Sequence, residues 1–227
     1  VFSFMCIILV IMKGIHFQEV NIKDCLTNED QRLTLAYESL EEIPSMLIDS
    51  CGHFVRTLDI SHNKFRNVKF LHKFQNLTSL ILDDNEIDSD TIFPELPQLQ
   101  LLWLNQNKIE QLFPFIQNVY NSFPHLQHLS LMGNTAVPMS IDDSTFYQYL
   151  QYRLFVISWF PELNHLDERA VTPDEREEAI RLYKRPLIER ISQQEYVQKA
   201  LKTLTSSFKE FWSNPRSPST GRRSNFI

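Results

Sequence analysis

Glycine and cysteine are both scarce in this chain. Its 227 residues include 4 glycines and 3 cysteines, and neither GxGxxG nor GxxxxGK[ST] occurs. A glycine-rich loop that holds phosphate is therefore not expected. Cys6, Cys25 and Cys51 form no CxxC motif, and an odd number leaves one thiol unpaired. This pattern argues against a disulfide framework and favours a reducing compartment, so we expect a cytoplasmic protein.

No stable membrane span is expected either. Residues 1–12 are apolar except for Ser3, but a spanning helix needs about 20 such residues. The basic start and small-residue cleavage site of a signal peptide are missing. Three interpretations of this N-terminal extension, residues 1–28, stay open. It is a gene-model artefact with Met12 as the true start, a truncated signal or anchor, or a genuine terminal element.

The charge is unevenly distributed. The chain carries a net charge of -6. Residues 1–186 hold 15 basic and 25 acidic side chains, a net of -10, whereas residues 187–227 hold 7 and 3, a net of +4. An acidic body repels the phosphate backbone, so direct nucleic-acid binding is not expected.

One pattern, L-x-x-L-x-L-x-x-N-x-[IF], recurs along the middle of the chain. Its asparagines are 22, 22 and 27 residues apart: Asn63, Asn85, Asn107 and Asn134. The fourth copy loses its last position at Ala136, and a degenerate first copy has Glu38 in place of the asparagine. Such a period is typical of a leucine-rich repeat.

The repeat predicts its own fold. The L-x-L leucines have a period of two, so both point to one side of a short strand. Parallel stacking of the strands merges these sides into one core. Each asparagine amide both donates and accepts, so it satisfies buried backbone groups of neighbouring turns. We expect an α/β leucine-rich repeat solenoid over residues 29–143, with a short, right-handed curved parallel sheet and a structural asparagine ladder.

Helical patterns follow the repeats. The longer fourth turn predicts a helix over residues 112–123, and residues 144–158 predict a capping helix within a cap of residues 144–170. Thr172 and Glu175 form a capping-box signature for a helix ending at Lys184. Further C-terminal helices are expected up to residue 212, and the Ser/Pro/Arg-rich residues 213–227 are expected to be disordered.

The second C-terminal helix pattern, residues 187–212, is amphipathic and basic. Two interpretations stay open: a helix docked on the body, or a helix that binds a partner or a membrane surface.

Motifs for chemistry are weak. His125 and His128 have a metal-like spacing but no third ligand, and residues 83–90 resemble a calcium loop without its central glycine and closing glutamate. We expect no metal, no cofactor and no catalytic residue, and therefore no enzyme.

The concave side of the predicted sheet is the better candidate. Residues that flank the core leucines point outward there, and several are apolar. Trp103 is the strongest candidate because tryptophan is enriched at binding hot spots. The predicted partner-binding residues are Asp59, Ile81, Asp83, Leu101, Trp103, Asn105, His128 and Ser130. Alternatively, the C-terminal helix covers this face intramolecularly.

The chain from Leu33 to about Arg185 resembles intracellular leucine-rich repeat proteins with a C-terminal cap. The carrying motifs are YRLFVI at 152–157, FPELNHLD at 160–167 and VTPDEREEA at 171–179. LILDDN at 80–85, LNQNKI at 104–109 and LSLMGN at 129–134 favour the melanocyte differentiation-associated branch over the spliceosomal A-prime branch.

The favoured branch implies a monomeric adaptor in melanosome or endosomal trafficking that binds a Rab-type small GTPase. The other branch implies a nuclear ribonucleoprotein scaffold. A third hypothesis, a secreted or anchored repeat protein, predicts a glycan on Asn76.

Overall fold

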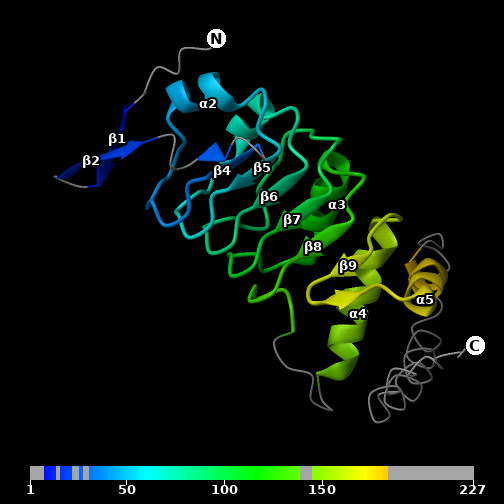
Figure 1. The fold of residues 1–227 in the computed structure, drawn as a ribbon. Helices are drawn as coiled ribbons and strands as arrows, with labels where there is room; N and C mark the ends of the chain where they lie inside the picture. The colour runs from blue at the N-terminus through cyan, green and yellow to red at the C-terminus, as the bar shows by residue number, and fades with distance from the viewer. Residues whose placement is uncertain (1–7, 14–15, 22–25, 28–30, 139–144, 184–227) are drawn as a thin grey trace, which may run out of the picture.

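The computed structural model describes residues 8–13, 16–21, 26–27, 31–138 and 145–183. Two predictions, the helix over residues 187–212 and disorder over residues 213–227, lie outside the described residues. Residues 31–138 form a curved solenoid, and residues 145–183 form the helical cap that ends it (Figure 1).

An eight-stranded sheet runs the length of the solenoid. Its inner strands β4 to β9 are parallel, and an antiparallel strand closes each end. This confirms the predicted α/β leucine-rich repeat fold. The strands, in spatial order, are β3 (Leu26–Thr27), β4 (Arg32–Thr34), β5 (Thr57–Asp59), β6 (Ser79–Ile81), β7 (Leu101–Trp103), β8 (His128–Ser130), β9 (His165–Leu166) and β10 (Arg169–Ala170).

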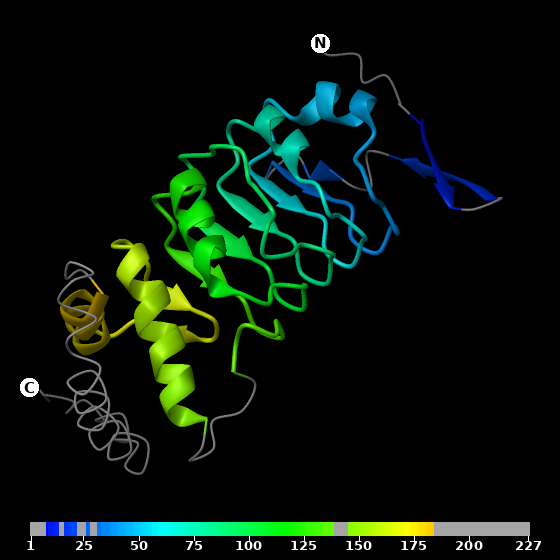
Figure 2. The same ribbon diagram turned by 180° about the vertical axis from the view of Figure 1, so that it is seen from behind.

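The core lies between the strands and the helices of the convex side. Leu58, Leu80, Leu102 and Leu129 are partners in register and at most 1% exposed. Their alignment makes one apolar column, as the period-two pattern predicts. The convex side carries α2 (Ser45–Cys51), the 3-10 helix η1 (Lys69–Lys73) and α3 (Leu112–Ser122), and Figure 2 shows these elements from behind.

The asparagines tie successive turns together. The Asn107 side-chain amide donates to the Leu82 carbonyl of the preceding turn at 2.9 Å, and its oxygen accepts from the Ile87 amide at 3.0 Å. Asn63, Asn85 and Asn134 make the equivalent pairs of bonds. All four side chains are buried. Each one therefore satisfies backbone groups that would otherwise lie unpaired in the core.

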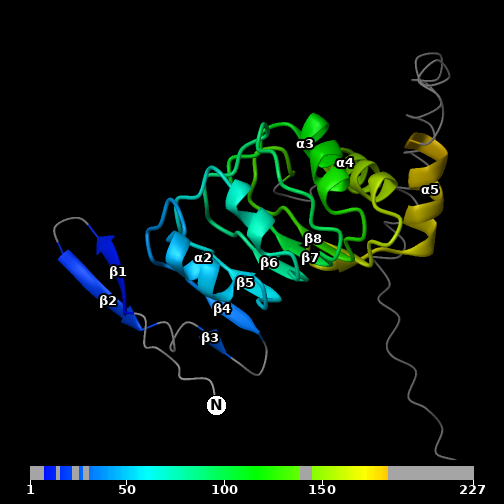
Figure 3. The ribbon, with the colours of Figure 1, turned by 90° about the horizontal axis from the view of Figure 1, so that it is seen from above.

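The cap contains two helices, α4 (Phe146–Trp159) and α5 (Pro173–Tyr183), joined through β9 and β10. Figure 3 shows α3 and α4 on one side of the sheet. At the start of α5, the Glu175 amide donates to Thr172 Oγ1 at 3.1 Å, and the Thr172 amide donates back to Glu175 Oε2 at 2.9 Å. The predicted capping box is thus confirmed.

The N-terminal apolar run lies partly in a hairpin. Strand β1 (Ile8–Lys13) pairs antiparallel with β2 (His16–Asn21), and the hairpin extends beyond the first repeat (Figures 1 and 3). Within the described part of the chain, no helix combines the length and apolar character needed to cross a membrane.

Candidate protein-binding face

The predicted binding residues lie on four adjacent parallel strands, β5 to β8, or directly after them. One row across the sheet aligns Asp59, Ile81, Trp103 and Ser130, and a second aligns Leu101 with His128. Asp83 and Asn105 follow the ends of β6 and β7. The register therefore brings all eight predicted residues onto one surface, called the concave face from here on.

The centre of the concave face is apolar. Trp103 is 40% exposed although it lies in an inner strand, and Ile81, its partner in register, is half-buried. Leu101, two residues before Trp103 on the same side of β7, is also half-buried. A large ring held in the middle of a sheet and open to solvent is typical of a surface that meets another protein.

The sequence predicts that Asp59 points outward on the concave face, and the structure corrects its exposure. The residue is 9% exposed and its side chain 12% exposed, and Arg32 Nη2 lies 2.6 Å from Asp59 Oδ2. The Ser61 hydroxyl donates to the other carboxylate oxygen at 2.8 Å. Both oxygens are thus paired within the fold.

Ser130 and Asn105 are linked to each other. The Ser130 hydroxyl donates to Asn105 Oδ1 at 2.6 Å, and the Met132 amide donates to the same oxygen at 2.9 Å. Ser130 is only 5% exposed, which corrects its expected exposure, whereas Asn105 is half-buried. These bonds fix the polar surroundings of Trp103 across β7 and β8.

Asp83 provides acidic character beside the apolar centre. Its Oδ1 accepts a hydrogen bond from the Asn105 amide at 2.8 Å. Burial raises the pKa of Asp83 above its ordinary value, more than the hydrogen bonds from Asn105 lower it, and the charge of Asp59 adds to the rise. The half-buried carboxylate therefore gains when a positive group approaches it.

Histidine rings end the face at the cap. His128 stacks on His165 with ring centroids 5.0 Å apart and an interplanar angle of 16°. Burial and the neighbouring His165 lower the pKa of His128, so its neutral form is favoured. Sequence reasoning missed His165, although the spacing Leu163-x-His165-Leu166 repeats Leu126-x-His128-Leu129 and places both histidines alike.

His125, which forms the metal-like spacing with His128, lies outside the concave face. His125 Nδ1 lies 2.8 Å from Glu162 Oε1, an exposed contact outside the concave face. Among residues 31–138 and 145–183, no three His, Cys, Asp or Glu side chains gather as a metal site would need.

An aromatic stack borders the opposite end and was also missed. The ring of Tyr37, which is 67% exposed, stacks on His62 with centroids 4.0 Å apart. His62 Nδ1 in turn lies 2.8 Å from Asp84 Oδ2. All three residues have positive φ and occupy the same turn position in successive repeats. The repeat pattern of the sequence shows that Tyr37, His62 and Asp84 are equivalent positions, but it does not show that their side chains contact one another.

The comparison with known families agrees with this architecture. The leucine-rich repeat family matches residues 46–194, more than half of the chain, so this protein belongs to that family. Such proteins are generally non-enzymatic scaffolds, and their repeat domains bind proteins.

Two individual proteins refine the picture. The leucine-rich melanocyte differentiation-associated protein of Homo sapiens is 39% identical over 125 residues, which cover 53% of this chain and 61% of that protein. The chain thus spans less than two thirds of the length of this relative. The Drosophila melanogaster SNF/U2A' complex contains a chain with a similar fold, at a TM-score of 0.53 and 22% identity, covering 72% of this chain and 87% of that one.

Proposed function

We propose that this protein is a non-enzymatic adaptor that binds a partner protein through its concave face. The observation that carries the proposal is Trp103, a 40%-exposed indole in the middle of a parallel sheet. The apolar side chains of Ile81 and Leu101 flank it, and the half-buried carboxylate of Asp83 lies at the edge. An apolar centre with a polar rim is the arrangement of a protein interface.

The dimensions of the face support one compact element of a partner. The outward positions from Thr57 to Ser61 span about 13 Å along the strand, and the six strands from β4 to β9 span about 24 Å across the sheet. An α-helix with its side chains is about 10–12 Å across. The face therefore has room for a single helix or loop that lies across the strands.

The partner class to test first is the one that the family resemblance implies. It is a Rab-type small GTPase in melanosome or endosomal trafficking, and it requires a cytoplasmic location. The name of the human relative refers to melanocyte differentiation, and it favours this branch of the family over the spliceosomal one.

Affinity capture from a lysate tests the proposal, with the full chain and its Trp103→Ala variant as baits and mass spectrometry as the readout. Met46→Ala is the matched control, because Met46 is 62% exposed on the distant helix α2. We expect small GTPases or endosomal coat subunits to be captured by the parent and the control, and lost with Trp103→Ala. Equal capture by all three baits would rule out the concave face as the site.

A ribonucleoprotein scaffold is the second candidate, and the basic residues 187–227 favour it. It predicts splicing proteins among the captured partners and RNA binding that weakens steeply as salt rises. Capture without splicing proteins, together with no salt-sensitive RNA binding, would eliminate it.

A further inference from the structure

The cap helix α4 has an uncharged stripe along one side. The stripe consists of exposed and half-buried residues that recur at helical spacing: Tyr147, Gln148, Gln151, Phe155, Ser158 and Trp159. The one charged residue of the helix, Arg153, is fully buried. Because a helix face that meets only water normally carries charged side chains, this stripe indicates that a further layer covers α4.

Aromatic rings extend the stripe across three helices. Phe155 contacts Trp159 on α4 with centroids 6.3 Å apart, and Tyr183 on α5 with centroids 5.6 Å apart. Tyr120 on α3 lies 6.0 Å from Trp159 by the same measure. All four rings are only partly buried. They form a continuous apolar strip rather than isolated exposed side chains.

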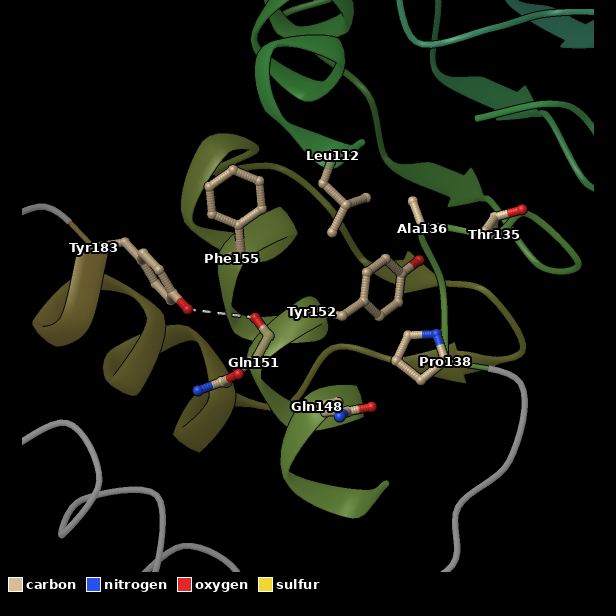
Figure 4. Close-up of a pocket in the computed structure, with 9 residues that line it drawn as sticks. All are labelled: Leu112, Thr135, Ala136, Pro138, Gln148, Gln151, Tyr152, Phe155 and Tyr183. Carbon is tan, nitrogen blue, oxygen red and sulfur yellow. Dashed lines mark hydrogen bonds between the residues drawn. The ribbon is translucent and has the colours of Figure 1, made fainter. Parts of the chain in front are cut away.

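A hollow lies beside the strip. A pocket of about 400 Å³ opens between the last repeat and the cap. Figure 4 shows Leu112, Ala136 and Pro138 on one side of it, and Phe155 and Tyr183 on the other. The pocket has a mixed lining, with Gln148 and Gln151 beside the apolar residues, and it continues into the aromatic strip.

We propose that residues 187–212 of the same chain dock along the α4 stripe. This segment begins four residues after Tyr183, whose ring already belongs to the strip, and Pro186 interrupts the helix so that the chain can turn back. Five of its apolar residues recur at helical spacing and would share one face of a helix: Val197, Leu201, Leu204, Phe208 and Phe211. As a helix, this face is about 21 Å long, which matches the 14 residues of α4 at about 1.5 Å per residue.

Charge is compatible with the same arrangement. Residues 187–212 hold 4 basic and 3 acidic side chains, a net of +1, and the body formed by residues 1–186 carries -10. The electrostatic attraction of this segment is weak, so the match between its apolar face and the uncharged stripe carries the placement. Docking on α4 leaves Trp103 accessible, in contrast to the alternative in which the same segment covers the concave face.

Tryptophan quenching distinguishes the two placements in the full chain. In a Trp103→Phe/Trp212→Phe background, Trp159 is the single reporter, and in a Trp159→Phe/Trp212→Phe background, Trp103 is. Leu201→Asp/Leu204→Asp places two charges on the apolar face of the segment. Thr203→Asp/Ser206→Asp adds the same charges on the other side and is the matched control.

We expect Leu201→Asp/Leu204→Asp to raise the acrylamide quenching constant of Trp159 about two-fold, since the indole loses the cover of the segment and keeps only its contacts with Phe155 and Tyr120. The control variant and the Trp103 reporter should show no change. Leu204→Ser, a milder substitution, should shift Trp159 in the same direction without disturbing the cap. The proposal is overturned if the quenching of Trp159 is unchanged, or if Trp103 responds instead, which would assign the segment to the concave face.

Discussion

Arg153 and Glu175 form a buried ion pair at the centre of the cap, and removing one charge should destabilise the protein more than removing both. Their side chains are each 1% exposed. Arg153 Nε and Nη2 donate to the two carboxylate oxygens at 2.7 and 3.1 Å, and Nη1 donates to the Leu166 carbonyl at 3.0 Å. The pair therefore joins α4, β9 and α5.

The structure gives the expected magnitudes. Arg153→Met leaves a buried carboxylate without its counter-ion, which costs about 3–5 kcal/mol of the free energy of unfolding. Glu175→Leu leaves the guanidinium unpaired and also breaks the capping box with Thr172, so it should cost about 4–6 kcal/mol. The double variant removes both charges, and only the lost cap and the unpaired Leu166 carbonyl remain, at about 1–3 kcal/mol.

Urea unfolding measures the three variants in the Trp103→Phe/Trp212→Phe background, in which Trp159 in α4 gives the fluorescence signal. Arg181→Met is the control, because its ion pair with Glu178 is more exposed and should contribute less than about 1 kcal/mol. If the double variant costs the sum of the two single variants, within about 0.5 kcal/mol, the two charges are independent and the reasoning is refuted.

Two further predictions concern the repeats. Asn107→Ala should lower the free energy of unfolding by about 2–4 kcal/mol, since the Leu82 carbonyl and the Ile87 amide lose their shared partner; a thermal melt shift equivalent to less than about 0.5 kcal/mol would contradict this. The pKa of His128 is lowered in the fold, so the unfolded chain binds its proton first, and stability should fall as pH drops below about 6.5. His128→Gln should flatten the profile between about pH 7 and 5 in urea titrations, and a profile as steep as that of the parent would count against it.

The repeated part of the fold was predictable because the residues that determine each strand and turn lie within the same repeat. The leucine pair sets the strand face, and the asparagine sets the bond to the previous turn, so neither needs information from distant residues. The helix at residues 112–123 was predictable from the five-residue excess of its turn. The capping box at Thr172 and Glu175 was predictable because both partners lie within one helical turn.

Features that depend on pairs from different repeats were not predictable in the same way. The pattern within one repeat places Asp59 on the concave side, but only the stacking brings Arg32 against it. The same holds for Ser130, whose hydroxyl meets Asn105 of the preceding repeat. The buried ion pair had a usable signal, since Arg153 is the one charge in an otherwise uncharged helix.

The N-terminal hairpin also differs from expectation. The apolar run of residues 1–12 is shorter than a membrane-spanning helix, and its sequence pattern predicts no strand. Strands β1 and β2 pair antiparallel. In the sequence, Gly14 stands between these two strands, and glycine is a typical sequence signal for a hairpin. The apolar character of the run alone does not indicate a strand pair, whereas this glycine does.

The hydrogen bonds of the concave face decide where its selectivity should reside. Asp59, Asn105 and Ser130 already have partners within the fold, so a partner that used them would first have to break those bonds. Such fixed side chains instead hold the surface in one shape, and this lowers the entropy lost on binding. Ile81 and Trp103 offer apolar area without that cost, so affinity should follow the shape of the partner against these two residues, while Asp83 at their edge selects its charge.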